Sequence, residues 1–338
     1  MKKIINDRED LVPELLEGFS LAYSDAIRII DDRIVVRRSP KPDGKVALVT
    51  LGGSGHEPAL SGFVGTGLLD TSVPGEIFAA PGPDRCVRAL QMSDRGAGVL
   101  FLVLNHAGDV LTANYATERV TASGLNARMI VVNDDIASGA PEQKENRRGL
   151  VGILPVIKIA GAAAEAGLPL DVVADLAEAV VDNTRTLGVG FREASHPVTG
   201  ASPLTIPENS MVVGMGQHGE RTGETFAMTN ADSLAEMMVS RLVEDLGVSR
   251  GDELLVLLNG AGATSLMELF IVFRQVWRSC VDRGITVARS KIGEFVTAQE
   301  QAGFQINITR LTPEMKKHWD APCSAPFFPT IFPPNDPE

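Results

Sequence analysis

The sequence has few cysteines, and none has the spacing of a metal or redox motif. Cys86, Cys280 and Cys323 are the three thiols in 338 residues, and no C-x-x-C pair occurs among them. An odd number of widely separated cysteines suits a reducing compartment and argues against a disulfide framework. We expect three buried thiols without a chemical role.

Positive charge and long apolar runs are also scarce. The chain has 31 Lys and Arg against 43 Asp and Glu, which gives a net charge of −12. Because phosphate backbones require clustered cations, this balance argues against nucleic-acid binding. No apolar run approaches the ~20 residues that cross a bilayer, and residues 1–10 lack the apolar segment of a signal peptide. We therefore expect a cytoplasmic protein that binds neither nucleic acid nor membrane.

The familiar phosphate-binding loops are missing as well. The stretch LGGSGHEPAL, residues 51–60, is rich in glycine but fits neither G-x-x-x-x-G-K-[S/T] nor G-x-G-x-x-G. It carries His56 where the first of these motifs would carry a lysine. Since glycine lets backbone approach a small ligand closely, the stretch predicts a loop that presents an imidazole.

The first half of the chain has the pattern of an α/β fold. Apolar runs at 45–51, 98–104 and 127–132 alternate with helical patterns such as 112–123. This alternation predicts a layered α/β domain with a mostly parallel sheet, in which ligands collect at the carboxyl ends of the strands. The glycine loop, residues 105–109 and residues 133–135 each follow a predicted strand, so we expect them to meet at one edge.

The second half begins again after a stretch of turn-forming residues at 188–209, which we interpret as a domain junction. The length allows two domains, and we place them at 1–190 and 191–338. Further elements follow from the apolar patterns: helices at 149–167, 170–184, 231–246 and 264–283, a strand followed by a loop at 211–224, and strands at 253–260, 285–293 and 304–311.

Two of the five histidines have unusual surroundings. His56 and His218 each lie in a glycine-rich turn after an apolar strand. Together with Asp109, they have the ligand types of a metal site. They also suit chemistry on a small polyol, in which Asp109 accepts a hydroxyl proton. A neutral imidazole can add to a ketone as a nucleophile. The residues alone leave both interpretations open.

Seven motifs along the chain, in order, resemble the substrate-binding (K) subunit of dihydroxyacetone kinases. They span nearly the whole sequence: GGSGHEPA (52–59), PGEIFAAP (74–81), N-x-x-G-D (105–109), NRRGLVG (146–152), GMGQHGE (214–220), NGAGAT (259–264) and WDAP (319–322). The resemblance implies a two-domain α/β subunit, each domain a β-sheet flanked by helices, that forms a homodimer and binds a short ketose.

The resemblance also implies roles for individual residues. His218, in the C-terminal domain, would attack the ketose carbonyl through Nε2 and hold it as a covalent hemiaminal. Asp109 would be the base that activates the terminal hydroxyl, and His56 would assist it. The ketose pocket of the N-terminal domain would be lined by Gly53, Ser54, Gly55, His56, Leu104 and Asp109. No metal ligand is implied.

The sequence departs from the family pattern before Asp109. The family usually reads Lys-Asn-Tyr-Thr-Gly-Asp where this chain has Leu104, Asn105, His106, Ala107, Gly108 and Asp109. Leu104 removes an ammonium group, and losing a buried donor costs about 1–3 kcal/mol if its acceptor stays unpaired. One interpretation is a pocket retuned for another ketose, such as four-carbon erythrulose. The other is that Leu104 only packs and dihydroxyacetone is the substrate.

Phosphoryl transfer also needs groups that hold the donor's phosphates, and we find no such motif. We expect the NGAGAT loop to serve packing, and Arg147 and Arg148 to form salt bridges or cap a helix rather than to bind phosphate. In the family the nucleotide sits on a separate helical (L) domain or subunit, so we expect ATP or ADP with Mg²⁺ on a partner and no cofactor on this chain. The leading hypothesis is an enzyme subunit, and the alternatives are a ketose sensor and a metallohydrolase.

Overall fold

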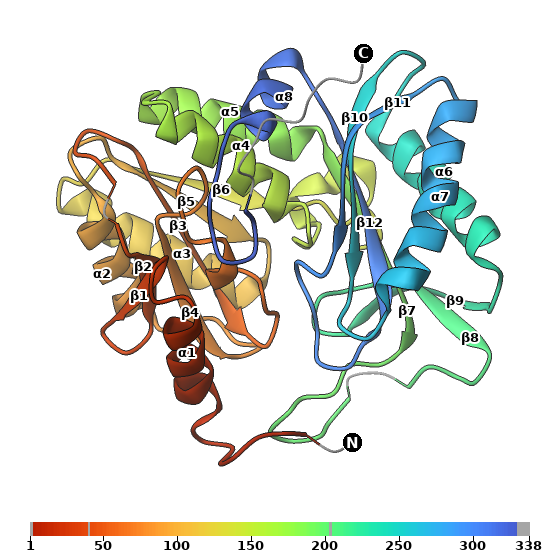
Figure 1. Cartoon of the computed structure of the whole chain (residues 1–338), viewed down its shortest axis with the longest axis horizontal. Helices are drawn as coiled ribbons and strands as arrows, with labels where there is room; N and C mark the ends of the chain where they lie inside the picture. Colours follow the sequence, from red (N-terminus) through yellow and green to blue (C-terminus); the bar gives the residue numbers. More distant parts are fainter. Residues whose placement is uncertain (1–2, 40, 203–204, 330–338) are drawn as a thin grey trace. The chain divides into compact units, whose positions relative to one another are not determined.

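The computed structural model describes residues 3–39, 41–202 and 205–329 (Figure 1). The chain forms two compact units, and each consists of segments that are not consecutive in sequence. The first unit draws on residues 1–131, 153–180 and 313–338, and the second on residues 132–152 and 181–312. The linear division predicted between residues 190 and 191 differs from this arrangement, because it falls inside a strand of the second unit.

The first unit is built on a six-stranded sheet in the order β1-β2-β4-β3-β5-β6. Its central strands β4, β3 and β5 are parallel, whereas β1, β2 and β4 pair antiparallel. The prediction of a parallel sheet therefore holds for the centre. The strands are β1 (Ile27–Ile30), β2 (Ile34–Arg37), β3 (Ala47–Ser54), β4 (Thr71–Ile77), β5 (Val99–Leu104) and β6 (Ala127–Val132).

Helices cover this sheet on both sides. Apolar side chains of β3 and β5 pack with α2 and α3 in one core, and α4 also contacts β3 and β5. Every residue of β5 is buried, as expected of a strand covered on both faces. The helices are α1 (Leu11–Ala22), α2 (Pro83–Ser93), α3 (Ala107–Ala122), α4 (Ile153–Glu165), α5 (Leu170–Asp182) and α8 (Pro313–Asp320), with a 3₁₀ turn η1 (Ser61–Phe63).

The second unit also has a six-stranded sheet, in the order β11-β10-β12-β7-β8-β9. In this sheet β10 and β11 pair parallel, and the other neighbouring strands run antiparallel. Helices α6 and α7 pack on one face of it (Figure 1). The elements are η2 (Pro141–Asn146), β7 (Thr184–Arg192), β8 (Ser210–Met215), β9 (Arg221–Ala227), α6 (Ala231–Leu246), β10 (Glu253–Gly260), α7 (Leu266–Asp282), β11 (Thr286–Gly293) and β12 (Ala302–Arg310).

Two sheets flanked by helices confirm the predicted α/β fold. The three cysteines are buried free thiols, as expected. The predicted junction at 188–209 begins inside β7, and its residues 203–204 lie outside the described part of the chain. Within the described residues, no helix is both long and apolar enough to cross a membrane.

Candidate functional site

The glycine-rich stretch after β3 is shaped by a close approach of backbone. A Cβ atom on Gly53 would lie 2.7 Å from the backbone nitrogen of Ala79, and Gly55 has a φ of +97°. Both positions therefore require glycine. The hydroxyl of Ser54 donates to the carbonyl oxygen of Gly75 at 2.8 Å, which ties the end of β3 to β4.

His56 lies in this turn and is buried, with 3% of its surface exposed. Its ring centroid is 4.9 Å from that of Phe78, and the two rings are tilted by 31°. Phe78 follows β4 directly. Packing against this ring fixes the position of the imidazole in the loop.

Asp109 lies in the first turn of α3 rather than in a loop, because the helix begins at Ala107, five residues before the predicted start at 112. Its side chain is 7% exposed. Among the described residues, its Oδ1 atom is buried without a hydrogen-bond partner. Burial raises the pKa of Asp109 to about 7, because the charged form loses its hydration. A carboxyl with this pKa can exchange a proton near neutral pH.

The parallel strands β4, β3 and β5 bring the glycine-rich stretch after β3 and the strand-to-helix turn after β5 to the same edge of the sheet. The segments after β3, β4 and β5 all leave from the carboxyl ends of neighbouring parallel strands. Residues 78–81 lie between the other two segments. Ala79 meets Gly53 on one side, a Cβ on Gly108 would lie 3.5 Å from Ala80 on the other, and Thr112 Oγ1 donates to Pro81 O at 3.3 Å.

Leu104 is the last residue of β5 and is 2% exposed. Its buried apolar side chain offers no donor to a ligand. His106 is the N-cap residue of α3, and its backbone N–H donates to the Leu104 carbonyl at 2.7 Å. The departures from the family pattern therefore fall in the strand-to-helix turn that leads to Asp109.

A cavity of about 410 Å³ adjoins the glycine strand. Gly53 and Ser54 border it, together with Leu15 and Phe19 of α1. His56, Leu104 and Asp109 are not among its lining residues. The cavity therefore lies beside Gly53 and Ser54, and the side chains of His56 and Asp109 lie outside its lining.

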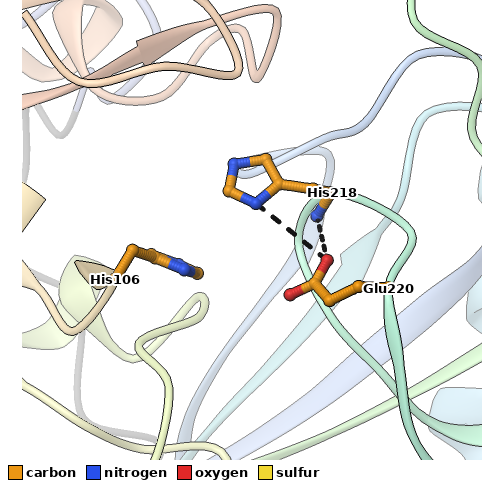
Figure 2. A group of neighbouring side chains, drawn as sticks. All are labelled: His106, His218 and Glu220. Carbon is orange, nitrogen blue, oxygen red and sulfur yellow. Dashed lines mark hydrogen bonds and ion pairs between the residues drawn. The ribbon is translucent and has the colours of Figure 1, made fainter. Parts of the chain in front are cut away.

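In the second unit, His218 occupies the turn between β8 and β9. Its backbone N–H donates to Glu220 Oε2 at 2.8 Å, and its Nδ1 atom lies 4.0 Å from the same oxygen (Figure 2). The side chain is 31% exposed. Burial lowers the pKa of His218, and the Glu220 carboxylate opposes this change. The lowered pKa favours the neutral imidazole, which is the form that can act as a nucleophile.

Glu220 is itself held by a partly buried ion-pair network. Arg148 Nη1 donates to Glu220 Oε1 at 2.8 Å, and Arg148 Nη2 lies 2.6 Å from Oδ2 of the fully buried Asp135. The sequence motifs include Glu220 and Arg148 but assign no role at the site to either. The position of Glu220 two residues after His218 is the signal that points to it.

Arg147 also forms an ion pair, so the predicted salt bridges of Arg147 and Arg148 are both confirmed. Arg147 binds both carboxylate oxygens of Asp245, at 2.8 and 2.6 Å. Both guanidinium groups are therefore used inside the second unit. Asp245 also accepts from Arg185 Nε at 2.7 Å.

The NGAGAT loop serves packing, as predicted. Asn259 is fully buried; its amide donates to Val296 O and accepts from the backbone N–H groups of Phe295 and Val296. Thr264 Oγ1 likewise bonds to the backbone of Gly303. These bonds tie β10 to the segments around it.

The expectation that residues 133–135 join the edge beside the glycine loop is wrong. Asp134 instead accepts the backbone N–H groups of Leu150 and Gly152, at 2.7 and 2.8 Å, and Asp135 binds Arg148. Both carboxylates are fully occupied in holding the segment 132–152 within the second unit.

Comparisons with known proteins identify the family. Residues 17–327 match the model of the Dak1 domain. The L-erythrulose kinase of Pectobacterium atrosepticum is 38% identical over 332 residues; the alignment covers 97% of this chain and 56% of that protein. This chain thus spans about half the length of that relative.

Two other matches cover nearly the whole of both chains. The dihydroxyacetone-binding subunit DhaK of the PTS-dependent dihydroxyacetone kinase of Lactococcus lactis is 38% identical over 311 residues, covering 92% of this chain and 93% of that protein. The solved structure of the dihydroxyacetone kinase operon co-activator DhaQ has a TM-score of 0.88 and 27% identity, covering 93% of this chain and 97% of that one.

Proposed function

This chain belongs to the Dak1 family, and on that basis we propose that it captures a short ketose and presents the terminal hydroxyl for phosphorylation. The observation that carries the proposal is Asp109, a buried carboxyl whose pKa is raised to about 7 and whose Oδ1 has no hydrogen-bond partner among the described residues. A base that titrates near neutral pH is matched to the removal of a hydroxyl proton.

The capture step uses His218. Its unprotonated Nε2 adds to the carbonyl carbon, the carbonyl oxygen gains a proton to become a hydroxyl, and Nδ1 loses one. No water leaves, so the product is a hemiaminal that carries the whole mass of the ketose. Glu220, 4.0 Å from Nδ1, favours the Nδ1–H tautomer and stabilises the positive charge that develops on the ring. A bond to the carbonyl carbon also distinguishes dihydroxyacetone from glycerol, which has no carbonyl.

The transfer step uses Asp109. Its carboxylate takes the proton of the terminal hydroxyl, with help from His56, and the resulting oxygen attacks a phosphoryl group. Gly53, Ser54 and Gly55 line the ketose pocket. A separate helical L-type subunit would hold the nucleotide with Mg²⁺: either ATP, from which ADP is the leaving group, or ADP that a phosphocarrier first phosphorylates. Our proposal includes no cofactor or metal bound by this chain.

The substrate is dihydroxyacetone or a four-carbon ketose. The relative from Pectobacterium atrosepticum is named for L-erythrulose and the one from Lactococcus lactis for dihydroxyacetone. The apolar Leu104 favours a pocket that differs from that of the usual family pattern. We expect adducts with both sugars and a preference for erythrulose.

Intact-protein mass spectrometry under mild conditions tests the capture. The purified chain is mixed with dihydroxyacetone, with each erythrulose enantiomer or with glycerol. We expect the full mass of the ketose to be added, none with glycerol, and none in His218→Ala. His196→Ala, which changes another histidine of the second unit, should keep the adduct. An adduct that persists in His218→Ala would show that the nucleophile is another residue.

A sensor is the second candidate, because one similar structure is that of an operon co-activator. The variant Asp109→Asn separates the two functions. In a sensor it should keep both the adduct and the regulatory response, whereas in a kinase subunit it should keep the adduct but lose turnover. The assay adds an L-type subunit and a phosphoryl donor and measures ketose phosphate. If no short ketose is phosphorylated by the reconstituted pair, the kinase function is excluded.

A further inference from the structure

A small cavity of the first unit is lined by an unusual number of cationic side chains. It measures about 70 Å³ and lies among β1, β2, β4 and the C-terminal end of α2. Its lining contains one carboxylate, that of Asp70, and four cations: Arg28, Arg37, Lys41 and Arg95. The whole chain has fewer cations than carboxylates, 31 against 43. This cationic cavity therefore reverses the charge balance of the protein and suits an anion.

The carboxylate of Asp70 is already satisfied by other groups. It accepts from Arg37 Nη1 and from the backbone N–H of Leu48, both at 2.9 Å, and Lys45 Nζ lies 3.1 Å from it. Glu165 pairs with the same two cations, at 3.1 and 3.3 Å. Arg37 and Lys45 thus balance these two carboxylates, and Asp70 has no charge to spare for the remaining cations of the lining.

Lys41 is a buried cation without a counter-ion among the described residues. Its side chain is 5% exposed, and its ammonium group donates to the carbonyl oxygen of Lys45. An ammonium group has three donors, so two are left for a ligand. Burial lowers the pKa of Lys41 to about 8, because the attraction of Asp70 and Asp94 does not make up for the lost hydration. An anion in the cavity would supply the missing charge.

Arg28 borders the cavity from the edge strand β1. It stands opposite Val36 of β2, and Val36 stands opposite Thr71 of β4, so the three side chains form a row on one face of the sheet. Arg28 is exposed, and its guanidinium forms no hydrogen bond or ion pair with another described residue. A guanidinium has five donors in a planar fork that matches the oxygens of phosphate. Its donors are therefore available to a ligand.

The end of α2 provides hydroxyl groups and a third cation. Thr71 Oγ1 and Ser93 Oγ lie 2.8 Å apart; their hydrogen bond uses one hydroxyl proton and leaves the other for a ligand. Arg95 follows α2 and pairs with Asp43, and both side chains are exposed. Because exposed pairs contribute little to stability, Arg95 can bind an anion at small cost. The neighbouring Asp94 carboxylate is occupied by two backbone N–H groups of the turn after α2.

The size of the cavity limits the ligand to a single small anion. Its volume of about 70 Å³ is roughly twice the ~30 Å³ that one water occupies in the liquid. Guanidinium, ammonium and hydroxyl groups are the donors that hold phosphate oxygens in proteins. We propose that the cationic cavity binds one phosphate group through Arg28, Lys41 and Arg95. Neither His56 nor Asp109 lines this cavity, so the proposal is independent of the proposed function.

Isothermal titration calorimetry on the full chain without ketose tests the proposal. Inorganic phosphate is titrated at constant ionic strength, with sodium chloride as the control titrant. We expect one phosphate per chain and no saturable binding of chloride. Arg28→Met should weaken phosphate binding about tenfold or more, because it removes a charge-assisted contact. Arg38→Met removes another exposed arginine, which does not line the cavity, and should bind like the wild type.

Methyl phosphate as a further titrant separates the two sources of a phosphate group. Binding as tight as that of inorganic phosphate assigns the cavity to phosphate esters, whose organic part projects past the exposed arginines. Binding of inorganic phosphate alone assigns it to the free ion. A wild-type chain that binds neither compound, or an equal loss of affinity in Arg28→Met and Arg38→Met, would overturn the proposal.

Proton uptake on binding tests the contact with Lys41. An anion beside the ammonium group favours its charged form, so phosphate should raise the pKa of Lys41 above about 8. At about pH 9, where inorganic phosphate is already a dianion, binding should take up to about one proton from the buffer. Titrations in buffers of different ionisation enthalpy measure this uptake, which Lys41→Met should abolish and Arg38→Met should keep. Phosphate binding to the wild type without proton uptake would exclude this site, even if Lys41→Met did not fold.

Discussion

Arg148 donates to one carboxylate oxygen of Glu220 at 2.8 Å, and the other oxygen of that carboxylate accepts the backbone N–H of His218 at 2.8 Å. The orientation of the histidine turn therefore depends on a cation 72 positions before Glu220 in the sequence. Four of the predictions below concern groups whose charge is set by burial or by such a partner.

Glu220→Gln should lower the pKa of His218 further. The carboxylate is the group that raises this pKa, so its loss leaves the lowering effects of burial and of Arg148 unopposed. We expect ketose capture to weaken roughly tenfold, or about 1.4 kcal/mol, because the ring loses the charge that stabilises its cationic form. NMR titration of the His218 ring and the fraction of adduct at each ketose concentration provide the two measurements.

Glu224→Gln is the matched control, since Glu224 is an exposed carboxylate on the neighbouring strand β9. It should change neither the His218 titration nor the adduct. If Glu220→Gln and Glu224→Gln captured ketose equally well, Glu220 would have no role in the chemistry of His218.

Phosphoryl transfer should rise as the pH increases through about 7. Below this value Asp109 is protonated and cannot accept the hydroxyl proton. Asp109→Asn should slow transfer by about 10²–10⁴-fold, the usual contribution of a general base, and remove this step from the pH profile. Steady-state rates of the reconstituted pair between pH 5.5 and 8.5, a range of about one and a half units on either side of the pKa, give the profile; a midpoint near pH 4 would contradict the assignment.

Asp109 should also make the free energy of unfolding fall as the pH rises from about 4 to 7. In this range the folded protein retains the proton on Asp109, while the unfolded chain has released it near its ordinary value of 3.8. Stability that depends on the bound proton is therefore lost as pH passes through the folded pKa. Asp109→Asn should flatten this slope and stabilise the protein at pH 8 by up to about 4 kcal/mol, as measured by urea unfolding at several pH values. An unchanged slope would mean that Asp109 is ionised in the folded protein.

Arg148→Met should destabilise the protein by about 3–5 kcal/mol, because it leaves the fully buried Asp135 carboxylate without its cation. Adding Asp135→Asn should recover much of the loss. Arg128→Met is the control, because the Arg128–Asp171 pair is exposed and pairs of that kind contribute less than about 1 kcal/mol. Urea unfolding compares the four proteins, and equal losses from Arg148→Met and Arg128→Met would contradict the argument.

Gly53→Ala should distort the glycine-rich stretch at 51–60 without removing any of the side chains that we propose act on the ketose. The added methyl group would lie 2.7 Å from the backbone nitrogen of Ala79, so β3 or the segment 78–81 must move. We expect a cost of about 1–3 kcal/mol and a loss of ketose binding. Gly82→Ala, next to the same segment, adds its methyl group into open space and should have little effect on thermal unfolding or adduct formation. Wild-type binding in Gly53→Ala would mean that the close approach is dispensable.

The sequence predicts the most regular elements of the fold well. The amphipathic pattern at 231–246 and the apolar run at 253–260 have the same bounds as α6 and β10. Elements with weaker patterns were missed: Pro74 and Gly75 interrupt β4, and β9 is polar and mostly exposed. The early start of α3 was missed because Gly108 and Asp109 favour a loop when only local preference is considered.

The sequence indicates the chemistry of the site only for residues that stand out by their local sequence. Glycine context singles out His56 and His218, but the raised pKa of Asp109 depends on burial, which the local sequence does not encode. The Arg148–Glu220 pair is equally inaccessible, because strand order brings these residues together across a long separation in sequence. The roles of His56, Asp109 and His218 remain predictions, and the variants above test those of Asp109 and His218.

The interleaved composition of the two units restricts how this protein can be taken apart. The chain passes from one unit to the other after residues 131, 152, 180 and 312. A cut at residue 190 would divide β7, which lies between β12 and β8 in its sheet. It would also separate α8, which belongs to the first unit, from the N-terminal fragment that holds the rest of that sheet. Neither half should fold when expressed alone, so truncation series and recombined chimaeras have to respect four crossover points instead of one linker.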